Sequence, residues 1–137
     1  MKNADLAIRV GVMAALSDLG YTVRDMVARP DDQLPYVLLS SQTAIGEDMK
    51  TQFGTQNTLL VQIYGKQSLV VNRGEVDAIA DDIMAQLIPI DTSSYIAVSG
   101  FQVIKTTLDS LIDDTISDSD GIVCRKQIRI RFILREL

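Results

Sequence analysis

The chain has 137 residues, of which 47% are hydrophobic and 23% are charged, as in a globular domain with one hydrophobic core. It carries 13 basic and 18 acidic side chains, and the net charge of −5 argues against general attraction to nucleic acid or anionic membranes. It has no histidine and one cysteine, Cys124, which excludes Cys–His and Ser–His catalytic pairs, an internal disulfide and the usual zinc ligands.

The N-terminal residues predict neither a signal peptide nor a membrane segment. Asp5 and Arg9 interrupt the apolar residues there, and no apolar run in the chain approaches the roughly 20 residues of a membrane span. The single cysteine favours a reducing, cytoplasmic origin.

Residues 3–19 are predicted to form a helix, with Asn3 as its N-cap and Gly20 as its C-cap. One apolar stripe recurs at helical spacing and should face the core: Ile8, Val12, Ala15, Leu16 and Leu19. A second stripe lies on nearly the opposite side of the helix: Leu6, Val10 and Met13. A lone surface helix needs only one stripe, so the helix is either deeply buried or contacts another subunit through the second stripe.

The next segment predicts two or three strands. A weak strand over 21–28 leads into a loop with two prolines over 29–35, and 36–41 reads as a better strand. Residues 42–57 are polar, contain two glycines and show little periodicity, which predicts a long functional or mobile loop that orders against a partner. Residues 58–65 then form a strand with one apolar face: Leu59, Val61 and Ile63.

Residues 74–88 give the clearest helix pattern, and Pro89 ends it. Its apolar stripe consists of Val76, Ile79, Ala80, Ile83, Met84 and Leu87. Residues 101–114 and 121–137 are extended runs, with turn residues over 115–120, and they predict a long antiparallel hairpin. We therefore expect a single α+β domain over residues 1–137, with a mainly antiparallel sheet, two helices packed on one face and a long C-terminal β-hairpin.

The last strand has two unlike faces. Its apolar face consists of Ile128, Ile130, Phe132 and Leu134. Its other face consists of Arg129, Arg131, Ile133 and Arg135. The arginines could meet water, pair with acidic residues of the same hairpin, or face the acidic residues of a neighbouring subunit in a closed ring.

No segment predicts a catalytic, cofactor or metal site. The stretch "YGKQS" over 64–68 lacks the first glycine of a phosphate loop, because Leu60 occupies that position. Asp81 and Asp82 are adjacent on a helix and diverge, and the acidic residues over 113–120 lack the spacing of a calcium loop. Cys124 is interpreted as an ordinary strand cysteine. We therefore expect no enzyme activity, no cofactor and no metal.

Four stretches, in order along the chain, resemble the tail completion or tail terminator proteins of long-tailed bacteriophages. They are "LPYVLLSS" (34–41), "EDMKTQFGTQNTLLVQIYGK" (47–66), "RGEVDAIADDIMAQL" (73–87) and "SDGIVCRKQIRIRF" (119–132). The chain departs from the family at Met49, where a tryptophan is common, and at Tyr64, near which histidine or tryptophan is frequent.

This resemblance implies a structural virion protein at the tail end or neck, assembled in the host cytoplasm. It implies a homo-hexameric ring that caps the tail tube, stops tube polymerisation and presents a surface to the head–tail connector. DNA would pass through the lumen without specific binding, and no membrane would be involved. The expected partners are therefore further copies of the chain, the tail tube protein and the connector protein.

Nine residues are candidates for the subunit interface on this interpretation: Leu6, Val10, Met13, Met49, Lys50, Phe53, Arg129, Arg131 and Arg135. Two other functions stay open. One is a different head–tail connector or tube-like part of the same kind of particle, and the other is a small cytoplasmic α+β domain that binds a ligand.

Overall fold

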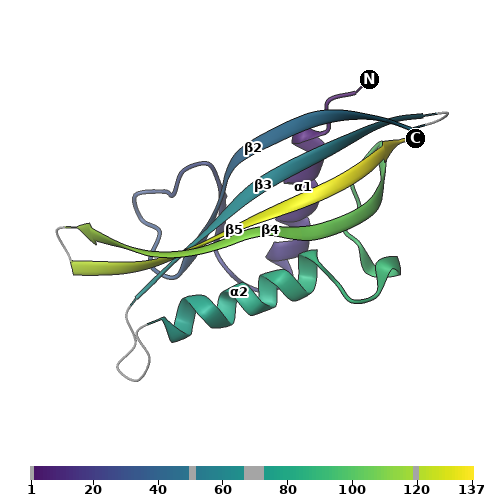
Figure 1. Ribbon diagram of the computed structural model, residues 1–137. Coiled ribbons are helices and arrows are strands. Elements are labelled where there is room, and N and C mark those ends of the chain that lie inside the picture. The colour runs from purple at the N-terminus through teal and green to yellow at the C-terminus, as the bar shows by residue number, and fades with distance from the viewer. Residues whose placement is uncertain (1, 50–51, 67–72, 119–120) are drawn as a thin grey trace.

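The computed structural model describes residues 2–49, 52–66, 73–118 and 121–137. The elements, in chain order, are α1 (Asp5–Ser17), β1 (Val23–Asp25), β2 (Tyr36–Met49), β3 (Gln52–Lys66), α2 (Gly74–Leu87), a 3-10 turn (Thr92–Ser94), β4 (Phe101–Asp118) and β5 (Gly121–Glu136). Within this part of the chain, the strands form one sheet in the order β1-β2-β3-β5-β4 (Figure 1). Only β1 runs parallel to its neighbour, and every other pairing is antiparallel.

Both helices pack on one face of this sheet. From α1, the buried side chains are Ile8, Val12 and Leu16, and from α2 they are Val76, Ile79, Ala80, Ile83 and Leu87. They form one core with the inward residues of the strands, which include Val37, Leu39, Leu59, Val61, Ile63, Ile128, Ile130, Phe132 and Leu134. The predicted α+β class, the helix stripes and the C-terminal hairpin are confirmed. Among the described residues, neither helix is long and apolar enough to cross a membrane.

The helix ends follow the predicted signals in part. Ala4 is the N-cap of α1 and makes no side-chain cap, but Asn3 Oδ1 accepts a hydrogen bond of 3.0 Å from the backbone N–H of Asp5. Gly20 has φ of +82°. Glycine adopts this left-handed conformation without strain, and this explains its position after the last turn of the helix.

The prediction of a loop over residues 42–57 was wrong. Residues 42–49 continue β2 and residues 52–57 begin β3, and the two strands pair in register from Gln42–Leu59 to Met49–Gln52. Residues 54–57 of β3 also pair with β5. Backbone hydrogen bonds between strands need no apolar alternation, and here polar residues occupy inward positions: Thr55 and Asn57 are buried, and the Asn57 amide donates to Thr55 Oγ1 at 2.6 Å. We call this long β2–β3 hairpin, over residues 42–57, the arm.

The predicted turn over residues 115–120 was also too long. Residues 115–118 belong to β4 and pair with residues 121–124 of β5, while residues 119 and 120 lie outside the described part. Serine and aspartate favour turns, but strand pairing already established along the hairpin extends over them.

Candidate subunit-interaction surfaces

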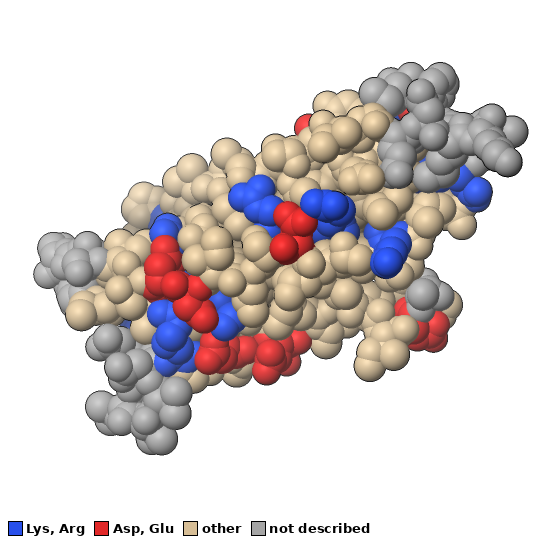
Figure 2. All heavy atoms as spheres, viewed as in Figure 1, with Lys and Arg blue, Asp and Glu red and all other residues tan. Residues whose placement is uncertain are grey.

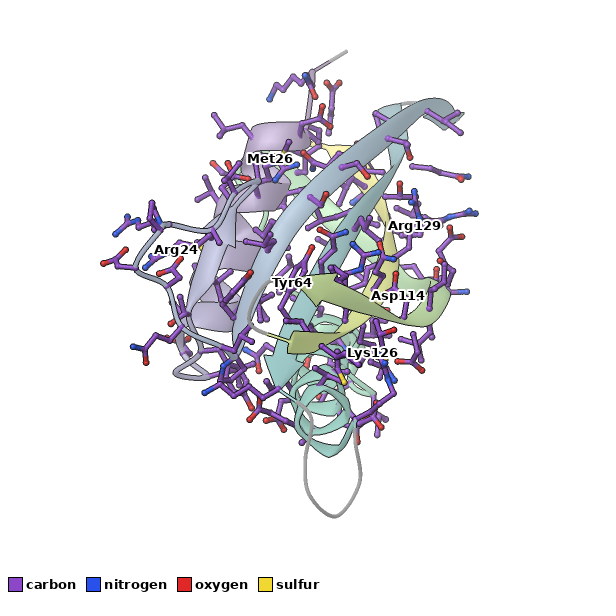
Figure 3. The ribbon with its side chains drawn as sticks, turned by 90° about the vertical axis from the view of Figure 1, so that its left-hand side faces the viewer. Arg24, Met26, Tyr64, Asp114, Lys126 and Arg129 are labelled. Carbon is purple, nitrogen blue, oxygen red and sulfur yellow. The ribbon has the colours of Figure 1, made fainter. Side chains whose placement is uncertain are left out.

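The arginines of β5 lie on the face of the sheet opposite the helices, as the alternation predicted. The residues between them, from Ile128 to Leu134 on the apolar face, are completely buried. Figure 3 shows Arg129 and Asp114 on the side of the sheet away from α1. We call this surface the open face. Figure 2 shows acidic and basic side chains next to one another on it.

Several arginines of the open face are paired within the chain. Arg131 Nη2 lies 2.6 Å from Asp109 Oδ1, and Arg135 donates a hydrogen bond to the side chain of Gln102. Arg125 makes a two-pronged contact with Asp114, and this charged hydrogen bonding lowers the pKa of the Asp114 carboxyl. The acidic residues of β4 thus neutralise part of the arginine row.

Arg129 differs from its neighbours. It is partly buried, and its side chain takes part in none of the hydrogen bonds or ion pairs found among the described residues. The residues opposite it in the register are Leu60 on β3 and Ser110 on β4, neither of which is charged. Among these arginines, Arg129 is therefore the one best placed to pair with a carboxylate of another molecule.

The second stripe of α1 faces outward. Leu6 is 75% exposed and Val10 is 60% exposed, and with Met13 they line a shallow groove of about 370 Å³. The interpretation of α1 as a helix buried all round was therefore wrong, because Leu6 and Val10 are exposed, whereas Met13 is partly buried against the core. Met26 and Val27, just after β1, add two more exposed apolar side chains.

Arg9 fixes this outer surface to the sheet. Its guanidinium pairs with Asp25, donates to Gln42 Oε1 at 2.7 Å and to the carbonyl oxygen of Leu39 at 3.0 Å, and also contacts Met26 Sδ at 3.5 Å. The sequence analysis assigned no role to Arg9, because its partners lie up to 33 residues away. Through Arg9, the outer surface of α1 is thus joined to Asp25 and Met26 at the end of β1.

Of the remaining three interface candidates, Met49, Lys50 and Phe53, the backbones of Met49 and Phe53 belong to the end of the arm. Met49 pairs with Gln52, and Phe53 pairs with Asp48. Lys50 and the side chains of Met49 and Phe53 lie outside the described part. Their assignment to an interface stays a prediction.

The sequence analysis missed an apolar surface on β4. Ile104, Leu108, Leu111 and Ile112 are each between 41% and 52% exposed. These residues were counted only as members of an extended run. Bulges in the pairing with β5 near Val103 and Leu108 break the simple alternation, so the sequence pattern could not assign each residue to a face of the sheet.

A buried charge network joins α2 to the hairpin. Lys126 is 8% exposed, and its Nζ lies 2.7 Å from Asp77 and 3.1 Å from Asp113. Arg73 pairs with Asp113 as well and donates to the carbonyl oxygen of Asp114 at 2.8 Å. Burial lowers the pKa of Lys126, but the hydrogen bonds that its ammonium donates to Asp77 and Asp113 outweigh burial, so the pKa is raised.

This network was also missed, although a signal existed. The β5 alternation, continued backward from Ile128, puts Lys126 and Cys124 on the core face, and both are buried. The network joins α2 to the C-terminal hairpin, which is consistent with a structural role. Within the described residues, no three acidic, cysteine or histidine side chains gather to hold a metal ion.

Known proteins resemble this chain in sequence and in fold. No protein-family model matches the chain. The chain is 26% identical over 104 residues to the tail completion protein gp17 of Bacillus phage SPP1, a match that covers 76% of this chain and 70% of the relative. A chain in the virion of a native gene transfer agent particle shares the fold, with a TM-score of 0.72, 13% sequence identity and coverage of 98% of this chain and 99% of that chain. The sequence match and the shared fold confirm the resemblance of this chain to the tail completion proteins of bacteriophages.

Proposed function

We propose that this chain is a structural protein of a phage tail, which closes the end of the tail tube as a ring of identical copies. The sequence similarity to a tail completion protein over three quarters of the chain carries this proposal. In the ring, the chain stops tube polymerisation and offers a joining surface to the head connector. A homo-hexamer is the expected form.

The surfaces of the single chain support such an assembly. The outer surface of α1 and the apolar side chains of β4 are exposed, and Arg129 lacks a charged partner within the described residues. Monomeric soluble proteins rarely expose large apolar patches, whereas interfaces combine apolar side chains with arginine. The net charge of −5 suits a channel through which DNA passes without binding.

Electron microscopy of tail tubes tests this function. Tubes assembled without the chain should have open ends and variable lengths. Adding the purified chain should place ring-shaped density at one end of each tube and narrow the length distribution of tubes assembled in its presence. A folded chain that never binds tube ends would contradict the proposal.

The same images separate the alternative functions. A tube-like protein would lie along the whole tube, and a connector of the head would bind portals in the absence of tubes. A chain that decorates neither and binds a small molecule in a thermal-shift screen would instead be a ligand-binding domain.

A further inference from the structure

Two groups of exposed large apolar side chains lie at opposite edges of the sheet. One group, the α1 patch, consists of Leu6, Val10, Met26 and Val27. The other, the β4 patch, consists of Leu108 and Leu111. Because β1 and β4 are the two ends of the strand order, these patches lie on opposite sides of the molecule (Figure 1).

The β4 patch exists because the helix layer is narrower than the sheet. Leu108 pairs with Ile130, and Leu111 pairs with Ile128, so both leucines point to the face that the helices cover. Ile128 and Ile130 are completely buried, whereas Leu108 is 44% and Leu111 is 42% exposed. α1 packs on β1 and β2, and α2 packs mainly on β3 and β5. Around Leu108 and Leu111 the helix-side surface of β4 is therefore only partly covered, although Thr106 on the same face is buried.

The α1 patch has the complementary property. α1 already packs its first stripe on its own sheet, and its second stripe, with Leu6 and Val10, points away from that sheet. This stripe borders the open groove described above. The charge of Arg9 beside this stripe is already paired with Asp25, so it does not disfavour contact with an apolar partner. The chain thus has an exposed apolar helix surface at one edge and, at the other edge, a sheet surface with two half-exposed leucines.

We propose that the occupant of each patch is a second copy of this chain: the outer surface of α1 in one copy covers Leu108 and Leu111 of the next copy. The patches differ and lie at opposite edges, so the contact is heterologous and runs head to tail. An open row of copies joined in this way has a free α1 patch at one end and a free β4 patch at the other. Both patches are covered in every copy only when the row closes into a ring. This inference rests on the proposed ring and names the surfaces that build it.

Cysteine cross-linking tests the contact directly. A chain with both Val10→Cys and Leu108→Cys is treated with a short bis-maleimide at concentrations up to the millimolar range. Cross-linked dimers, trimers and larger species that stop at one size are expected. Cys124 is 1% exposed, so the wild-type chain serves as the unreactive control. The changed side chains are exposed, so the monomer should keep its circular dichroism spectrum.

The single variants decide the geometry. Val10→Cys alone and Leu108→Cys alone should remain monomeric, and an equal mixture of the two should give a dimer only. Efficient dimers from either single variant would show a symmetric contact and overturn the head-to-tail arrangement. A chain with Val10→Cys and Ile90→Cys is the matched control, because Ile90 is fully exposed outside both patches. Equal ladders from this control would also overturn it.

The outcome is distinguishable from failure of the proposed function. If rings form on tube ends but the double-cysteine chain gives no ladder there or in solution, the function stands and this contact is wrong. If a ladder forms but no tube end is ever decorated, the contact stands and the tail function is wrong.

Discussion

The buried network around Lys126 predicts an asymmetric response to mutation. Its ammonium group is surrounded by protein, with a side-chain exposure of 10%, whereas the side chains of Asp77 and Asp113 are 48% and 46% exposed. The lysine therefore bears most of the desolvation, and each aspartate can return to water if the lysine is removed. Removing the lysine and removing the aspartates should have very different costs.

The Lys126→Met variant should change the free energy of unfolding by at most about 1 kcal/mol in either direction. Half-exposed ion pairs contribute about 0–1 kcal/mol, and the apolar side chain of similar length recovers packing against α2. By contrast, the Asp77→Asn and Asp113→Asn double variant leaves a buried ammonium group without a charged partner, at a cost of about 3–5 kcal/mol. For a chain of this size, that corresponds to a decrease of roughly 10 °C in Tm.

Urea unfolding at neutral pH, followed by circular dichroism, measures both variants. The pH dependence is a second readout. The pKa of Lys126 is raised above its ordinary value of 10.5, so its stabilising contribution is present below pH 10.5 and is lost as pH rises through the folded-state pKa. The Lys126→Met variant should lack this alkaline loss. If it is as unstable as the double aspartate variant, the reasoning about unequal desolvation is refuted.

Three further changes test other parts of the structure. Gly11→Ala should destabilise the chain by about 1–3 kcal/mol in urea unfolding, because a Cβ there would lie 2.5 Å from the Ala97 carbonyl oxygen. The exposed control Ser17→Ala should cost less than about 0.5 kcal/mol. Equal costs for the two variants would refute the close packing at Gly11. Asp32→Asn should lower the free energy of unfolding at neutral pH but not near pH 2. Hydrogen bonds from Arg24 and the Arg29 backbone lower the pKa of Asp32 from 3.8 to about 2, so the stabilisation by the carboxylate is lost as pH falls through that interval. A difference in urea midpoint that stays constant across pH would contradict this. Arg129→Glu should leave the monomer folded, with a cost of about 0–1 kcal/mol in the free energy of unfolding. It should reduce ring assembly in a salt-dependent way, as measured by light scattering and by images of tube ends. The exposed control Arg29→Glu should assemble normally.

The sequence by itself determined the elements with strong periodicity. The stripe of α2 and the alternation from Ile128 to Leu134 each bury one face, so their patterns alone predicted element type and the core side. The resemblance to tail completion proteins also came from the order of short stretches, since no single stretch carries chemistry. These features are local, and local patterns are readable without knowing the partners of a segment.

The tertiary structure decided what depends on distant partners. Residues 42–49 and 52–57 have the composition of a loop, yet they form strands because β2, β3 and β5 supply one another's backbone hydrogen bonds. The acidic residues of β4 neutralise Arg125 and Arg131 but leave Arg129, a distinction that depends on register and on the bulges. Leu108 and Leu111 of β4 are partly exposed because two helices do not cover the full width of a five-stranded sheet. Neither the number of strands nor the width of the helix layer can be read from the residues next to these leucines in the sequence.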